Sequence, residues 1–167
     1  MPPRFFTHYW SNPTWRQYAA ASSAGEVPDH AASNLFRARG VAPGDFLYIV
    51  TLIHGALYLL TKLHIAVVCD VNEAADLLAT APELLWEADD HVVADASAPA
   101  HFDRQVPLTV AQALRFVTSA GPKPLTFEGN ERIDQQTLRG VRELTPEAPA
   151  NAEIRCQKTE LTRADGC

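Results

Sequence analysis

The sequence has few cysteines, no long apolar run and none of the common catalytic motifs. Its three cysteines, Cys69, Cys156 and Cys167, are widely spaced and odd in number, which does not fit a disulfide framework. No apolar stretch reaches the roughly 18 residues of a membrane-spanning helix, and residues 1–4 lack the apolar region of a signal peptide. We therefore expect a soluble, cytoplasmic protein in a reducing compartment, with no membrane partner.

The missing motifs argue against several enzyme classes. The chain has no Walker loop, no Gly-x-Gly-x-x-Gly and no Gly-x-Ser-x-Gly turn, which removes the usual support for nucleotide hydrolysis, dinucleotide chemistry and serine hydrolysis. Its six histidines include no pair at i and i+4, and no Cys-x-x-Cys knuckle is present, so we predict neither a metal site nor a cofactor. Cys69 stands beside Asp70, whose charge raises the pKa of the thiol and predicts an inert side chain.

What is present is the composition of one globular domain. The 167 residues are 47% hydrophobic and 20% charged, which is enough apolar material for a core. The apolar pattern stops near residue 149, so we expect a single domain over 1–149 and a polar tail over 150–167 that is disordered, extended or non-native. The net charge of −6 is concentrated in residues 70–100, which hold eight acidic residues and no Lys or Arg. This acidic block predicts a solvated helix face and still allows a modestly basic surface elsewhere.

A tight turn followed by apolar strands is the clearest structural signal. Pro43-Gly44-Asp45 has the residues of such a turn and leads into the β-branched and aromatic residues 46–51. A second apolar run over 56–60 follows a short link, and residues 64–69 either continue it or form another strand. These patterns predict a hairpin in a small antiparallel sheet.

Short helices are expected around this sheet. An alanine-rich segment over 14–24 and a segment over 73–79 capped by Asn72 both have helical character, and Thr109 with Gln112 forms a capping box. Short strands interspersed with helices, without a βαβ rhythm, predict an α+β fold. The expected architecture is a small curved antiparallel sheet or a β-barrel, flanked by short helices.

Aromatic and hydrogen-bonding residues are interleaved in the first part of the chain. Trp10, Trp15 and Phe36 supply flat apolar faces, and Ser11 and Asn34 stand among them. A nucleobase taken out of its stack needs aromatic walls and polar groups for its edge, so these residues are candidates for a base-binding pocket. The alternative is that the aromatic side chains only fill the core.

Basic residues close to this cluster are candidates for phosphate contacts. Arg16, Arg37 and Arg39 lie near the aromatic residues in the sequence. Because contacts between arginine and phosphate are charge-assisted, such a partner would be bound with a salt-sensitive affinity.

The order of these elements resembles the PUA-like superfamily, with the EVE and ASCH branches nearest. The resemblance rests on the strand at His8-Tyr9-Trp10, the following Trp15, the Pro43-Gly44-Asp45 turn and the apolar hairpin, and it covers roughly residues 5–69. It implies a compact β-barrel flanked by helices, closed by residues 125–144, whose members bind RNA or DNA. In several branches a modified base is read in an aromatic pocket, and Trp10, Trp15 and Asn34 are the residues carried over by position.

The function we expect is a non-catalytic nucleic-acid-binding module that recognises a modified or flipped base. One alternative is a small enzyme acting on a nucleotide or similar heterocycle, with Lys62 and Asp45 as its nearest candidate groups. Another is a protein-interaction domain that uses the acidic segment 70–100, including Asp89 and Asp90.

Overall fold

The structure is a computed structural model that describes residues 1–22 and 25–146. The expected tail over 150–167, with Cys156 and Cys167, lies outside the described residues. The helices are α1 (Asn12–Ala21), α2 (Val71–Leu77), η1 (Pro82–Leu84), α3 (Leu108–Ala113) and η2 (Gln135–Thr137), where η marks a 3-10 helix. The strands are β1 (Phe5–Tyr9), β2 (His30–Ser33), β3 (Phe46–Ile53), β4 (Ala56–Cys69), β5 (Asp90–Ser97), β6 (Arg115–Phe116), β7 (Lys123–Pro124), β8 (Phe127–Glu128), β9 (Arg132–Ile133) and β10 (Val141–Leu144).

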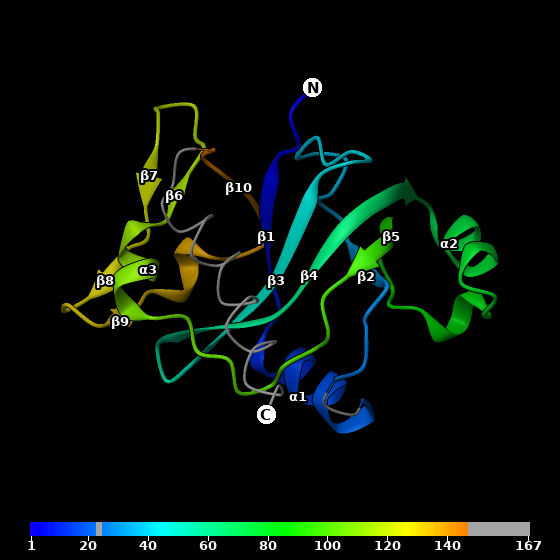
Figure 1. Cartoon of the computed structure of the whole chain (residues 1–167), viewed down its shortest axis with the longest axis horizontal. Coiled ribbons are helices and arrows are strands. Elements are labelled where there is room, and N and C mark those ends of the chain that lie inside the picture. The colour runs from blue at the N-terminus through cyan, green and yellow to red at the C-terminus, as the bar shows by residue number, and fades with distance from the viewer. Residues whose placement is uncertain (23–24, 147–167) are drawn as a thin grey trace, which may run out of the picture.

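Eight of these strands form one mixed sheet in the order β2-β5-β4-β3-β1-β10-β6-β7, and β8 pairs with β9 in a second sheet (Figure 1). The predicted α+β class is confirmed. The sheet is not purely antiparallel, because β1 runs parallel to β3. With α1 and β2 between them, the chain returns beside β1 in the same direction, as a crossover connection requires.

The barrel alternative was wrong for the described part of the chain. The sheet is open, with β2 and β7 at its edges, and residues 125–144 do not close it. Phe127–Glu128 belongs to the small second sheet, whereas Val141–Leu144 enters the main sheet between β1 and β6. Curvature comes from the 14-residue strand β4, whose pairing with its neighbours shifts register at several positions.

The predicted hairpin is confirmed as β3 and β4. Ile53 pairs with Ala56, and the two residues between them, His54 and Gly55, have φ angles of 53° and 84°. Positive φ at both central positions is the signature of a type I′ turn, which matches the twist of the flanking strands. Residues 64–69 continue β4 instead of forming a separate strand.

The Pro-Gly-Asp turn anchors the start of β1 as well as that of β3. The Asp45 carboxylate accepts hydrogen bonds from the backbone amides of Arg4 and Ala42, both at 3.0 Å. It also forms an ion pair of 2.8 Å with the Arg4 guanidinium, which in turn donates to the carbonyl of Gly40. A buried carboxylate therefore holds two parallel strands in register at their first residues.

Three helix caps decide how well the helices were predicted. Ser11 caps α1 with its hydroxyl. α2 begins earlier than expected, because the Asp70 side chain accepts from the amides of Asn72 and Glu73, so the prediction of Asn72 as the cap was wrong. The predicted capping box at Thr109 was also wrong: α3 begins after Pro107 without a side-chain cap.

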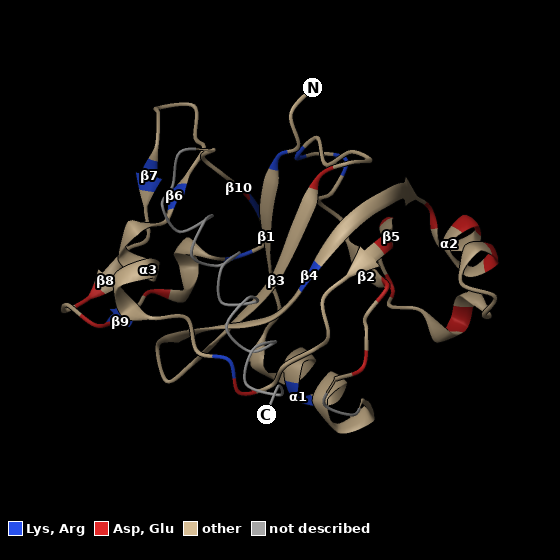
Figure 2. Cartoon of the chain, in the orientation of Figure 1, with Lys and Arg blue, Asp and Glu red and all other residues tan. Residues whose placement is uncertain are grey.

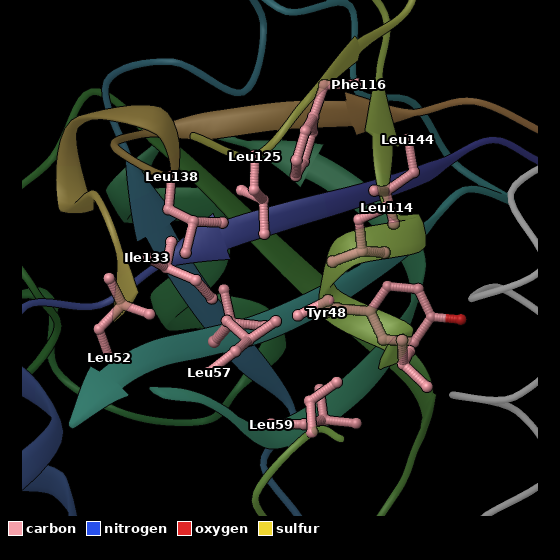
Figure 3. Packing of buried hydrophobic residues seen from close by; sticks show 14 of the residues in the cluster. Tyr48, Leu52, Leu57, Leu59, Leu114, Phe116, Leu125, Ile133, Leu138 and Leu144 are labelled. Atoms are coloured by element: carbon pink, nitrogen blue, oxygen red, sulfur yellow. The ribbon is translucent and has the colours of Figure 1, made fainter. Parts of the chain in front are cut away.

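Hydrophobic residues cover the central sheet on both faces. Tyr48, Val50 and Leu52 of β3 point into a cluster that includes side chains of α3 and of the segment around η2 (Figure 3). Leu47 and Ile49 point to the other side, into a cluster with Phe36, Trp10 and other buried side chains. Burial on both faces explains why β3 reads as a continuous apolar run.

The acidic block predicted for residues 70–100 occupies one end of the molecule. Figure 2 shows acidic residues gathered on α2 and on the segment that leads to β5, whereas Lys and Arg residues mark β6, β7 and β10. None of the described helices is long and apolar enough to cross a membrane.

Candidate functional site

A cavity of about 370 Å³ lies where β1 leads into α1, at a size typical of small-ligand sites. Three separate parts of the chain contribute to it: the end of β1, the loop after η1, and the loop between η2 and β10. We call it the aromatic cavity, and the lining residues that matter most for its chemistry are His8, Tyr9, Trp10, Ser11, Trp86 and Arg139.

Backbone hydrogen bonds from the sheet fix the position of this lining. The amide of Trp10 donates to the carbonyl of Val50 at 2.9 Å, and the amide of Tyr9 donates to the carbonyl of Gly140 at 3.0 Å. The Thr51 hydroxyl donates to the carbonyl of Trp10 at 2.7 Å. The end of β1 is therefore held from both sides, and the cavity wall that it forms is part of the rigid sheet.

His8 is the most unusual group of the aromatic cavity. Its ring lies perpendicular to those of Phe36 and Trp10, at centroid distances of 5.2 and 6.4 Å, and the residue is 7% exposed. Burial lowers its pKa from 6.5 to about 4, because the imidazolium would lose its hydration. Its Nδ1 is sealed from solvent with no hydrogen-bond partner among the described residues. A neutral imidazole therefore contributes to this wall at neutral pH.

Two indole rings form walls of different character. Trp10 is 6% exposed and packs on Tyr18 at a centroid distance of 5.2 Å, so its position is fixed by the core. Trp86 is 38% exposed and lies 6.4 Å from Trp10 at an angle of 50°. One indole is thus a fixed wall, and the other stands at the entrance, where it can pack against a flat ligand.

Polar groups line the rest of the aromatic cavity. The hydroxyl of Ser11 lies 3.0 Å from that of Thr14, and both residues contribute to the wall. Burial raises the pKa of Tyr9, while the charge of the nearby Arg139 lowers it, so the phenol stays protonated at neutral pH. Glu87 adds a carboxylate to the lining. The cavity therefore offers both donors and acceptors beside its aromatic walls.

The structure brings together only part of the predicted base-binding set. Trp10 and Ser11 line the aromatic cavity. Trp15 packs against Phe102, at a centroid distance of 6.1 Å and outside the lining, and its indole nitrogen is buried without a hydrogen-bond partner among the described residues. Phe36 is completely buried and supports the ring of His8.

Asn34 lies outside the lining of the aromatic cavity as well. Its side-chain oxygen accepts a hydrogen bond of 2.7 Å from the amide of Asp89, and this bond ties the turn after β2 to the segment before β5. The position of Asn34 therefore supports the loop that carries Trp86 and Glu87.

The three predicted phosphate contacts lie in different surroundings. Arg16 is exposed on α1. Arg37 forms an ion pair of 3.0 Å with Asp90, and its backbone amide donates to the same carboxylate at 2.9 Å. Arg39 lines a second cavity together with Arg139. Of the three, Arg39 is the one that the structure brings close to the lining of the aromatic cavity.

The groups named for the two alternative functions lie elsewhere. Asp45 is occupied by Arg4, and the ammonium of Lys62 lies over the ring of Phe46 at 4.1 Å; neither residue lines the aromatic cavity. Asp90 is buried, which removes one of the two carboxylates named for an acidic docking surface from direct contact with a partner.

Sequence reasoning missed His8, Trp86 and Arg139 as members of one site. His8 carried a signal, since residues two apart in a strand share a face and Trp10 follows at that spacing. Trp86 and Arg139 carried none, because they reach the cavity from loops that only the folded chain brings to the end of β1.

Comparison of the chain with family models, with curated proteins and with solved structures finds no match. Within the described ranges, no group of three or more His, Cys, Asp or Glu side chains is arranged to hold a metal ion. What the aromatic cavity can do chemically is therefore argued from its own residues: it can stack a flat ring and hydrogen-bond the edge of that ring.

Proposed function

We propose that this chain is a PUA-like module that binds nucleic acid and accepts a modified or flipped base in the aromatic cavity. The observation that carries the proposal is the combination of Trp10, Trp86 and a neutral His8 around one cavity of about 370 Å³. A base removed from its stack recovers stacking energy on aromatic walls and hydrogen bonds at its polar edge. The lining supplies both kinds of group in one place.

A neutral histidine suits this role better than a charged one. The imidazole of His8 keeps one N–H donor and one acceptor at neutral pH, which is the pairing that the edge of a heterocycle requires. Arg139 and Glu87 at the same cavity add a charged donor and a charged acceptor. The cavity thus favours a flat ligand with an alternating edge over a purely aliphatic one.

Tryptophan fluorescence tests the proposal, because the chain has three tryptophans and two of them line the aromatic cavity. In Trp15→Phe the remaining indoles are Trp10 and Trp86, so any quenching reports on this cavity. The ligands are short single-stranded DNA and RNA oligonucleotides that carry each standard base, together with the methylated forms of adenine and cytosine. We expect quenching by at least one of them at low salt.

Trp86→Ala then tests the stacking contact. Since loss of one base–aromatic stack costs about 1–3 kcal/mol, affinity should fall roughly 5- to 100-fold. Trp86 is partly exposed, so this substitution leaves the core intact. Binding that is unchanged by Trp86→Ala, or an absence of quenching in Trp15→Phe across the whole set, would overturn the proposal.

A further inference from the structure

A second cavity, of about 520 Å³, lies beside the aromatic cavity. It is lined by Arg39, Arg139 and Arg142, with Ser119 and Glu143 among its other polar residues. We call it the arginine cavity. Arg139 lines both cavities, so the two are neighbours across the loop that leads into β10.

The arginine cavity concentrates positive charge. Three guanidinium groups face one carboxylate, that of Glu143, in its lining. Burial lowers the pKa of Arg142, and the charge of Arg39 lowers it further, as expected when two cations approach one another. The ion pairs found within residues 1–22 and 25–146 involve Arg4, Arg37 and His64, and not these three arginines.

The geometry also holds one of the three arginines in place. Arg142 donates a hydrogen bond of 2.7 Å to the carbonyl of Thr137 and lies over the ring of Phe116 at 5.0 Å. Arg139 donates to the Gln136 side chain at 3.3 Å, which leaves most of its donors available, since a guanidinium has five N–H groups. Arg39 is exposed. A fixed guanidinium between two freer ones suits an anion with several acceptor oxygens.

We infer that the arginine cavity binds a phosphate ester attached to the nucleoside whose base occupies the aromatic cavity. This inference rests on the proposed function and names its ligand class: a nucleotide or a nucleic-acid strand, not a free base or nucleoside. Arg139 joins the two subsites, while Arg39 and Arg142 contact phosphate oxygens, and the hydroxyl of Ser119 is a further donor in the lining. The phosphate-binding surface predicted around Arg16, Arg37 and Arg39 is thereby replaced by one that retains Arg39 alone.

The test compares the nucleoside, its 5′-monophosphate and a short single-stranded oligonucleotide, each with the base that quenches most strongly, or adenine if none does. Arg39→Gln is the diagnostic variant, and Arg16→Gln is the matched control, because Arg16 is exposed and lines neither cavity. Affinity is measured by fluorescence anisotropy and tryptophan quenching over a range of salt concentrations.

We expect Arg39→Gln to weaken binding of the phosphorylated ligands about 5- to 10-fold and to leave nucleoside binding unchanged. The slope of log affinity against log salt should decrease by about 0.7–0.9 for the oligonucleotide, the value for one lost phosphate contact. Arg16→Gln should retain the wild-type slope. Equal losses for the monophosphate and the oligonucleotide identify the ligand's own phosphate, and a loss confined to the oligonucleotide identifies a neighbouring phosphate of the strand.

Failure of this inference is distinct from failure of the proposed function. If Arg39→Gln leaves the affinity and salt slope of every phosphorylated probe unchanged while Trp86→Ala still weakens the nucleoside, the arginine cavity is not a phosphate site. If Arg39→Gln weakens the oligonucleotide while no probe quenches Trp10 and Trp86, the base-binding proposal fails and the phosphate site stands. If none of the probes binds the wild-type protein, both are overturned.

Discussion

The buried imidazole of His8 makes the stability of this protein depend on pH in a predictable direction. Its pKa is 6.5 in an unfolded chain and about 4 in the folded state. Between these values the unfolded state binds more protons than the folded state, so the free energy of unfolding falls as the pH is lowered. The contribution is fully present above pH 6.5 and is lost as the pH falls toward about 4.

The size of the effect follows from the same two values. At about 1.36 kcal/mol per unit of pKa, His8 loses about 1.4 kcal/mol of stability between pH 7.5 and pH 5.5, and about 3 kcal/mol once the folded state is protonated. Comparison at pH 5.5 is preferable, because most carboxylates remain ionised there. His30 titrates in the same direction, since burial and the neighbouring His91 lower its pKa to about 4.

Urea unfolding of the wild type and of His8→Phe at the two pH values measures this contribution. The decrease in the free energy of unfolding should be smaller in His8→Phe by about 1.4 kcal/mol, because the variant keeps His30 but loses the titration of His8. Leu138→Ala, on the opposite side of the sheet, is the control: it should lower stability without changing the pH dependence. Equal decreases in the wild type and in His8→Phe would refute the assignment of a neutral, buried His8.

Two further substitutions test the framework that positions the aromatic cavity. Asp45→Asn removes one carboxylate oxygen that accepts from Arg4 and from a backbone amide of the turn, so urea unfolding at pH 7 should show a loss of about 2–4 kcal/mol; a loss below about 1 kcal/mol would contradict a structural role. Gly140→Ala combines a φ of +76° with a methyl group 2.7 Å from Leu35, whereas Gly44→Ala has a φ of +90° and open space around the new carbon. Thermal unfolding should therefore show a larger loss for Gly140→Ala, about 2 kcal/mol against about 1 kcal/mol, and equal losses would contradict the close approach.

Local signals in the sequence determined several elements by themselves. The hairpin of β3 and β4 was predictable because its strands are β-branched and aromatic and its turn ends in Gly55, which accepts positive φ. The start of α1 was predictable because Ser11 precedes a run of helix-forming residues. Caps further along were misplaced by one or two residues, since Asp70 and Asn72 are both acceptable caps and only the backbone geometry chooses between them.

The pairing of strands and the lining of the cavity were decided only by the tertiary structure. β10 lies beside β1 although most of the chain separates them, and no local pattern encodes which edge a distant strand joins. Phe36 and Trp86 are both large aromatic residues, yet one is completely buried and the other stands at an entrance. The sequence determines that a residue is apolar, because that is a property of the side chain. Whether it faces the core or a ligand depends on what the rest of the chain packs against it.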